Sequence, residues 1–192
     1  IILCGPPGMS KTYIVKRTFY FEKLIPGKDY NIEKGSSLSP QATYDLLYQN
    51  KDRILVLDDF DTPLRSETTV NMLKAITDSY SKRILSFPRE LTMSRGDDAE
   101  ESSSPRKFEY KGKLIIITNI KKKDIDRALL SRAPAFEVNF SPKVVLSSLE
   151  NLIKFINPEV PEEDKREVLD YILLLYKKQH SIEIDFRAFK NS

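Results

Sequence analysis

Residues 5–12 read GPPGMSKT and combine the residue types that hold the phosphates of a nucleotide. A phosphate-binding loop has the pattern Gly-x-x-x-x-Gly-Lys-Ser/Thr, in which backbone N–H groups surround the phosphates. Gly5, Lys11 and Thr12 match this pattern, while Ser10 stands where the second glycine is expected. Glycine there spares a Cβ where the backbone meets the phosphate, so the serine adds a small side chain to a close contact. An ordinary Gly/Pro turn with a solvated lysine is the alternative, but the nearly complete ending of the motif favours a phosphate loop.

The residues of this loop would divide the work of binding a triphosphate and its magnesium ion. Lys11 would contact the β- and γ-phosphates, and the Thr12 hydroxyl would bind Mg²⁺. A helix that begins at the loop adds a favourable potential for an anion at its N-terminus. The expected nucleotide-binding residues are Gly5, Pro6, Pro7, Gly8, Met9, Ser10, Lys11 and Thr12.

Two acidic residues follow the apolar run ILVL at residues 54–57. Asp58 would hold Mg²⁺ through water, and Asp59 would orient or deprotonate the attacking water. Acids in a turn after a strand are also common without any catalytic role, but the phosphate loop upstream favours the catalytic interpretation. Because Asp59 is shorter than the glutamate often found at this place, we expect slow hydrolysis.

Four further polar residues are candidates for contacts with the triphosphate. Asn119 ends the apolar run LIIIT and would hydrogen-bond the γ-phosphate or the water, unless it only starts a turn. Arg132 lies between a predicted helix and a predicted strand, and could reach the nucleotide of a neighbouring chain; Arg127 is a weaker candidate for that role. Arg187 opens a predicted last helix and could close over the phosphates. Each arginine could instead be a solvated surface residue.

Apolar strands alternate with amphipathic helices, which predicts an α/β fold: a parallel sheet with helices on both faces. Strands are expected at residues 1–4, 29–33, 53–57, 113–118 and 135–140. Helices are expected at residues 10–25, 39–48, 66–80 and 124–131, with Ser39 and Ser66 as N-terminal caps. Ligands of such sheets bind at the carboxyl ends of the strands. The phosphate loop, the acid pair and Asn119 all follow predicted strands, which is the strongest argument for a common site.

The hydrophobic periodicity changes after residue 141, which predicts a second, helical part of the chain. Helices are expected at residues 144–156 and 161–178, and a third begins near Asp185. We therefore expect a nucleotide-binding domain over residues 1–140 and a helical lid over residues 141–192, truncated at its end.

A hairpin with a mobile loop is expected at about residues 83–112. The segments RILSFP and KFEYKG have the character of its two arms. Between them, residues 94–107 are polar, charged and poor in aromatic side chains, as is typical of a mobile loop.

The composition limits the class of protein. In 192 residues, 31 Lys and Arg against 28 Asp and Glu leave a net charge of +3, which argues against a general nucleic-acid coat but permits a local basic patch. Cys4 is the only cysteine, so no disulfide framework exists and a reducing compartment is expected. The apolar runs are too short to cross a membrane. His180, the single histidine, has no companion for a metal or a catalytic triad. A chain that starts inside a strand at Ile1 is expected to be a piece of a longer protein.

The motifs together resemble those of the AAA+ ATPases. GPPGMSKT, ILVLDD, LIIITN, LLSR and IDFRAF are similar to Walker A, Walker B, sensor 1, the arginine finger and sensor 2, in the family's order. The resemblance implies a cytoplasmic ATPase (host cytoplasm for a viral protein) that uses ATP and Mg²⁺ and works as a homo-oligomeric ring, such as a hexamer. Its active sites would lie between subunits, with Arg132 as the arginine finger and Arg187 in sensor 2.

Several details of the resemblance concern the branch of the family. Several branches of the family, including the MCM helicases and the MoxR-like ATPases, carry alanine at the place of Ser10, so a small residue there is compatible with activity. The predicted hairpin is similar to the pre-sensor-1 insertion of the helicase and chelatase branches, which commonly faces the central pore. The superfamily-three helicases of DNA viruses are the runner-up, although they usually lack a lid with an arginine such as Arg187. The chain also has the general character of phage ATPases.

Three functional hypotheses follow. The first is a motor or loader acting on DNA in replication, suggested by basic residues in or near the hairpin arms: Arg83, Arg89, Arg95, Arg106 and Lys107. The second is a protein remodeller of the MoxR or chelatase kind, in which Phe87 or Phe108 grips a polypeptide. The third is a nucleotide-binding scaffold with little turnover, suggested by Ser10 and Asp59.

Overall fold

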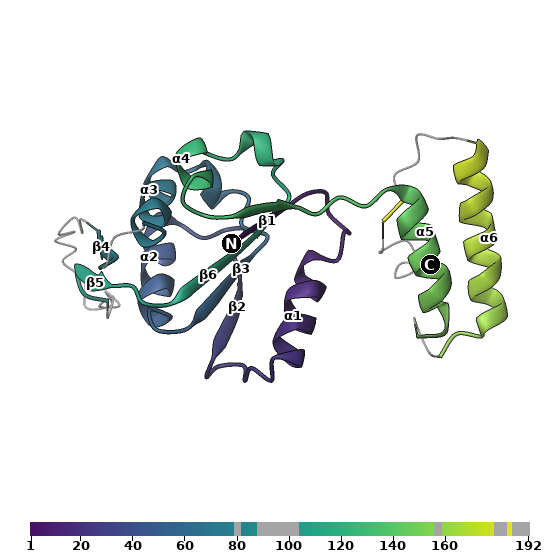
Figure 1. Cartoon of the computed structure of the whole chain (residues 1–192), viewed down its shortest axis with the longest axis horizontal. Coiled ribbons are helices and arrows are strands. Elements are labelled where there is room, and N and C mark those ends of the chain that lie inside the picture. Colours follow the sequence, from purple (N-terminus) through teal and green to yellow (C-terminus); the bar gives the residue numbers. More distant parts are fainter. Residues whose placement is uncertain (79–81, 88–103, 156–158, 179–183, 186–192) are drawn as a thin grey trace, which may run out of the picture. The chain divides into compact units, whose positions relative to one another are not determined.

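The computed structural model describes most of the chain as two compact units (Figure 1). The described residues are 1–78, 82–87, 104–155, 159–178 and 184–185. The first unit comprises residues 1–5 and 12–137, and the second comprises residues 6–11 and 138–192. The segment of the phosphate loop at residues 6–11 thus packs with the second unit. The expected division into domains at residue 140 stays a prediction.

The first unit is built on a sheet of five parallel strands in the order β2-β3-β6-β1-β7. The strands are β1 (Ile2–Cys4), β2 (Tyr30–Lys34), β3 (Ile54–Asp58), β6 (Lys113–Thr118) and β7 (Ala135–Glu137). In the register of the central strand, Ile2 lies opposite Ile116 on one side and Ala135 on the other. The predicted α/β class with a parallel sheet is therefore confirmed. The last strand ends at Glu137, three residues before the predicted end.

Helices cover both faces of this sheet, with α1 (Lys11–Phe21) on one face and the other helices of the unit opposite (Figure 1). Those helices are α2 (Pro40–Gln49), α3 (Glu67–Ile76) and α4 (Arg127–Leu130). Within β3, Leu55 and Leu57 join the core cluster of α2 and α3, whereas Val56 packs with Val15 and Phe19 of α1. Alternate side chains point to opposite faces of a strand, so strands buried on both faces must be apolar throughout.

Local capping signals explain where the helices begin. The Ser39 hydroxyl accepts the N–H of Ala42 at 3.1 Å, and the Ser66 hydroxyl accepts the N–H of Thr69 at 3.4 Å, which confirms both predicted caps. α3 ends at Ile76 rather than residue 80, and the Thr77 hydroxyl donates to the Leu73 carbonyl at 2.7 Å.

The predicted helix at residues 124–131 is only partly correct. The 3₁₀ turn η2 (Lys122–Asp124) comes first, and α4 starts after Asp126, whose carboxylate accepts the N–H of Leu129 at 2.9 Å. Asp126 is thus an N-cap that the sequence pattern did not single out.

The strands β4 (Ile84–Ser86) and β5 (Lys107–Glu109) form the antiparallel pair expected for the two hairpin arms. The hairpin is held to α2 because the Tyr44 hydroxyl donates to the Pro105 carbonyl at 2.6 Å. The Tyr44 ring also lies 5.3 Å from the ring of Phe87 and 5.2 Å from that of Phe108. The tip of the predicted hairpin, with Arg89, Arg95 and most of the stretch at residues 94–107, lies outside the described residues.

The second unit contains α5 (Pro142–Leu152), the 3₁₀ turn η3 (Ile153–Phe155) and α6 (Glu162–Lys178). The predicted helices at 144–156 and 161–178 correspond to these elements, while the helix expected after Asp185 lies outside the described residues. One buried cluster joins Met9 of the phosphate loop and Ile184 to side chains of α5, η3 and α6: Val145, Leu146, Leu149, Ile153 and Leu169. No helix within the described ranges is long and apolar enough to pass through a bilayer.

Replacing Leu55 with alanine tests the two-sided core. Leu55 is fully buried, so Leu55→Ala removes packed methyl groups and leaves a cavity. We expect the free energy of unfolding to fall by about 2–5 kcal/mol, measured by urea denaturation followed by circular dichroism. Ile84 is 42% exposed, and Ile84→Ala is the matched control with an effect below about 1 kcal/mol. Equal effects of the two substitutions would contradict this description of the core.

Candidate nucleotide-binding site

The candidate residues of the first unit gather at one edge of the sheet because three adjacent strands end there. Gly5 follows β1, Asp58 ends β3 with Asp59 directly after it, and Asn119 follows β6. β6 pairs with both β1 and β3 in parallel. The carboxyl ends of these strands therefore meet at a common edge, which is where ligands of open parallel sheets bind.

Thr12 and Asp58 are in direct contact, although they are 46 residues apart in the sequence. The Thr12 hydroxyl lies 2.8 Å from one carboxylate oxygen of Asp58 and 3.0 Å from the other. Asp58 is 9% exposed, and its Oδ1 also accepts the N–H of Asp59 at 3.2 Å. The structure thus brings together the two residues predicted to hold magnesium.

These donors fit Mg²⁺, which prefers hard oxygen ligands and usually keeps several waters. A hydroxyl, one carboxylate and the phosphates of a nucleotide are a sufficient set for such an ion. Across the ranges that the structure describes, no group of three or more His, Cys, Asp or Glu side chains is arranged to hold a metal.

Asp59 occupies an unusual backbone conformation directly after β3, with φ of +54°. Aspartate is among the few residues that tolerate the left-handed region, at a modest energetic cost. The turn is tied to the sheet because the N–H of Phe60 donates to the Ile117 carbonyl at 3.0 Å. Such outliers concentrate at functional sites, where surrounding contacts hold the strained residue.

Asn119 is held by a carboxylate that the sequence reasoning missed. The backbone N–H of Asn119 donates to Oδ1 of Asp61 at 2.8 Å, and its side-chain Nδ2 donates to Oδ2 at 3.1 Å. The Thr118 hydroxyl also donates to Oδ1, at 2.5 Å. The sequence feature that could have indicated this contact is the third acid in the run LDDFD, Asp61, two residues after the acid pair.

The phosphate loop at residues 6–11 is described within the second unit. Lys11 is 6% exposed, and its Nζ donates to the Pro6 carbonyl at 2.7 Å, so the ammonium group closes the loop on itself. Met9 packs in the core cluster of α5 and α6. The loop is consequently anchored at both an apolar and a charged residue.

Ser10 has a φ of +58°, which explains why the phosphate-loop pattern has glycine at this position. Gly5 and Gly8 in the same segment also have positive φ, of +138° and +76°. A left-handed conformation costs a residue with a Cβ about 1–2 kcal/mol. The serine is accommodated in the expected backbone shape, at the expense of local strain.

Gly8 shows that the loop accepts an anionic oxygen against its backbone. A Cβ on Gly8 would collide with the carboxylate of Asp185, so only glycine permits this approach. A carboxylate oxygen and a phosphate oxygen are both hydrogen-bond acceptors with negative charge.

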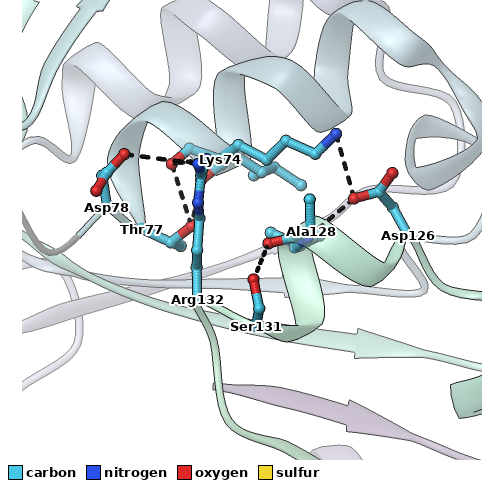
Figure 2. Close-up of polar contacts among 9 residues, drawn as sticks. Lys74, Thr77, Asp78, Asp126, Ala128, Ser131 and Arg132 are labelled. Carbon is cyan, nitrogen blue, oxygen red and sulfur yellow. Dashed lines mark hydrogen bonds and ion pairs between the residues drawn. The ribbon is translucent and has the colours of Figure 1, made fainter.

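Arg132 lies at the opposite edge of the sheet, as its contacts show (Figure 2). Its Nη2 is 3.9 Å from Oδ2 of Asp78, and its Nη1 donates to the Lys74 carbonyl at 3.4 Å. Arg132 precedes β7, and the N–H of Ile2 at the start of β1 donates to the Pro134 carbonyl at 2.8 Å. This location at the amino ends of the strands separates Arg132 from Asp58 and Asp59 of its own chain, which lie at the carboxyl ends. Arg127 is exposed on α4, and Arg187 lies outside the described residues.

A second ion pair links α3 to α4 beside Arg132: Lys74 Nζ lies 3.2 Å from Oδ1 of Asp126 (Figure 2). The N–H of Leu129 and the nearby ammonium group lower the pKa of the Asp126 carboxyl. Because the folded-state pKa is lowered, these contacts stabilise the fold above the ordinary aspartate pKa, and the contribution is lost as the pH falls below it.

The first unit has an α/β fold, with helices on both faces of a parallel sheet, and this fold is found in known structures. Structures of two mutants of RuvB from Thermotoga maritima are similar over 98% of this chain and about 60% and 59% of theirs, with a TM-score of 0.55 in each case. The sequence identity is 11%, so this similarity concerns the fold.

A sequence relative exists in Enterobacteria phage T4. It is an uncharacterised 36.7 kDa protein from the nrdC-mobD intergenic region, 28% identical over 131 residues. The match covers 67% of this chain and 37% of the phage protein, so the chain spans little more than a third of that relative. No protein-family model matches the chain.

Exchanging Ser10 tests the strain assigned to the loop. Ser10→Gly removes the Cβ penalty of about 1–2 kcal/mol but adds about 0.5–1 kcal/mol of chain entropy in the unfolded state. We expect a net stabilisation of up to about 1 kcal/mol in urea denaturation. Ser10→Ala keeps the Cβ and should not stabilise the protein. The same gain from both substitutions would show that the backbone conformation is not the cause.

Proposed function

We propose that this chain is an AAA+ ATPase module that binds Mg-ATP and couples its hydrolysis to the movement or remodelling of a macromolecule. The observation that carries the proposal is the contact of the Thr12 hydroxyl with the Asp58 carboxylate, at 2.8 and 3.0 Å. This contact connects Thr12, which follows the loop lysine Lys11, to Asp58 at the end of β3. The similarity to RuvB in fold supports the same class.

Each site residue has a role that its chemistry permits. Lys11 and the loop backbone bind the triphosphate, and Thr12 and Asp58 hold the magnesium ion, which supplies charge neutralisation on phosphate oxygens when bound. Asp59 orients the attacking water or takes its proton.

Two further groups complete the site. Asn119 hydrogen-bonds the γ-phosphate or the attacking water, beside the acids of its own chain. Arg132 serves the nucleotide of a neighbouring chain, because its place at the amino edge keeps it from its own site. Arg187 is proposed as a lid residue that closes over the phosphates.

DNA in replication, as the track of a helicase or the target of a loader, is the favoured substrate. Arg106 and Lys107 are exposed on the hairpin, where they could contact phosphates. Arg83 is engaged within the fold, since its guanidinium donates to the carbonyls of Ile76 and Gly112, both at 3.1 Å. The hairpin therefore offers fewer free cations than its sequence suggested.

The protein-remodelling alternative receives less support. Phe108 is 7% exposed, so it cannot grip a polypeptide in this conformation, and the expectation for this residue is wrong. Phe87 packs against Tyr44 and is only half-buried, which leaves it a weaker candidate. A MoxR-like or chelatase-like remodeller would need another aromatic residue to hold its substrate.

Nucleotide binding and turnover test the proposal. We expect Mg-ATP hydrolysis by the chain, and Lys11→Ala should lower the affinity for a fluorescent ATP analogue at least about tenfold because a phosphate contact is lost. Asp59→Asn should bind normally but lose about 10²–10⁴-fold in kcat. Lys16→Ala, at an exposed lysine of the same helix, is the matched control. Equal binding by wild type and Lys11→Ala would refute the site.

The same assay with single-stranded and double-stranded DNA at low salt examines the substrate. Stimulation that falls as salt rises is the expected result, because phosphate contacts release counterions. Turnover without any DNA binding would remove DNA from the proposal but leave the ATPase.

Mixing two inactive variants tests the role of Arg132. The Arg132→Ala variant keeps Asp58 and Asp59, and the Asp59→Asn variant keeps Arg132. In a mixed oligomer, some sites therefore combine intact acids from one chain with Arg132 from its neighbour. We expect each variant to be nearly inactive alone, and activity to return on mixing, measured as phosphate release. Failure to recover activity, with mixed oligomers verified by mass, would contradict an action between chains.

A further inference from the structure

We propose that Asp61 is a positioning residue that orients Asn119 for ATP hydrolysis; this inference rests on the proposed function of the site. Both oxygens of the Asp61 carboxylate are used. Oδ1 accepts the Thr118 hydroxyl at 2.5 Å and the Asn119 backbone N–H at 2.8 Å, and Oδ2 accepts Asn119 Nδ2 at 3.1 Å. One side chain thus fixes both the backbone and the amide of Asn119.

The contact is supported by the elements on both sides. Thr118 is fully buried, and its hydroxyl also accepts the N–H of Ile120 at 3.1 Å. Asp61 belongs to the turn after β3, whose Phe60 N–H donates to the Ile117 carbonyl at 3.0 Å. These contacts fix the position of Asn119 relative to Asp58 and Asp59, although Asp61 and Asn119 are 58 residues apart in the sequence.

The chemistry of the carboxylate decides which way the amide of Asn119 points. An ionised carboxylate only accepts hydrogen bonds, so the nitrogen of the amide, rather than its oxygen, must face Asp61. The amide oxygen then points away from Asp61, and its partner must be a donor. Water is such a donor and a phosphate oxygen is not. The geometry therefore favours the attacking water over the γ-phosphate as the partner of that oxygen.

A double-mutant cycle tests the inference. The variants are Asp61→Ala, Asn119→Ala and the double substitution, and kcat and KM for ATP are measured for each. We expect each single substitution to lower kcat about 10–100-fold with KM within about twofold, because a misplaced polar group affects the chemical step more than binding. If Asp61 acts through Asn119, the double variant is no slower than Asn119→Ala alone.

Two further variants separate positioning from a general effect. Asp61→Asn keeps an acceptor of the same shape, so we expect it to recover part of the kcat that Asp61→Ala loses. Asp124→Ala removes an exposed carboxylate of η2 that lies in the same surface pocket as Asn119, and should leave kcat unchanged. A thermal melt of each protein confirms that it is folded, and Asp61→Asn carries the test if Asp61→Ala does not fold.

The possible failures are distinguishable. Turnover by the wild type together with fully additive losses in the double variant, or with normal kcat in Asp61→Ala and Asp61→Asn, overturns this inference alone. Lack of turnover in the wild type, together with equal nucleotide binding by wild type and Lys11→Ala, overturns the proposed function and this inference with it.

Discussion

The hydrogen bonds between the Thr12 hydroxyl and the Asp58 carboxylate are the contact on which the candidate site depends. They connect the first turn of α1 to the last residue of β3, across the face that α1 covers. This arrangement is possible because the sheet is parallel and β6 lies between β1 and β3, so the carboxyl ends of these three strands lie at the same edge of the sheet. Close packing on both faces of the sheet holds the strand ends at fixed distances from one another. The apolar core therefore sets the positions of Thr12 and Asp58.

Local strain at the site is concentrated at two residues with side chains. Ser10 and Asp59 both adopt positive φ, although neither is a glycine. Contacts of the neighbouring residues offset the energetic cost of these conformations. Met9, which precedes Ser10, packs among the helices of the second unit, and the N–H of Phe60, which follows Asp59, donates to a carbonyl of β6. In each unit, contacts of the neighbouring residue thus hold the backbone of the strained residue in its conformation.

Features with a local physical cause could be predicted from the sequence. The apolar runs of β3 and β6 and the caps at Ser39 and Ser66 depend on neighbouring residues, and the structure contains them. The closeness of Thr12 and Asp58 followed from the rule that ligands meet strand ends. The contact of Asp61 with Asn119 could not be predicted in this way, because it depends on how the turn after β3 faces the end of β6. The same holds for the burial of Phe108, which depends on its packing against Tyr44 of α2, far away in the sequence.

The position of Arg132 at the amino edge of the sheet has a consequence for assembly. All five strands run in one direction, so the two edges are chemically different surfaces. An amino-edge arginine that contacts the carboxyl edge of another copy therefore joins two unlike surfaces. Where copies repeat this contact head to tail, the association is heterologous: every incomplete assembly has two unlike ends, and only a rotation that closes on itself leaves no end exposed.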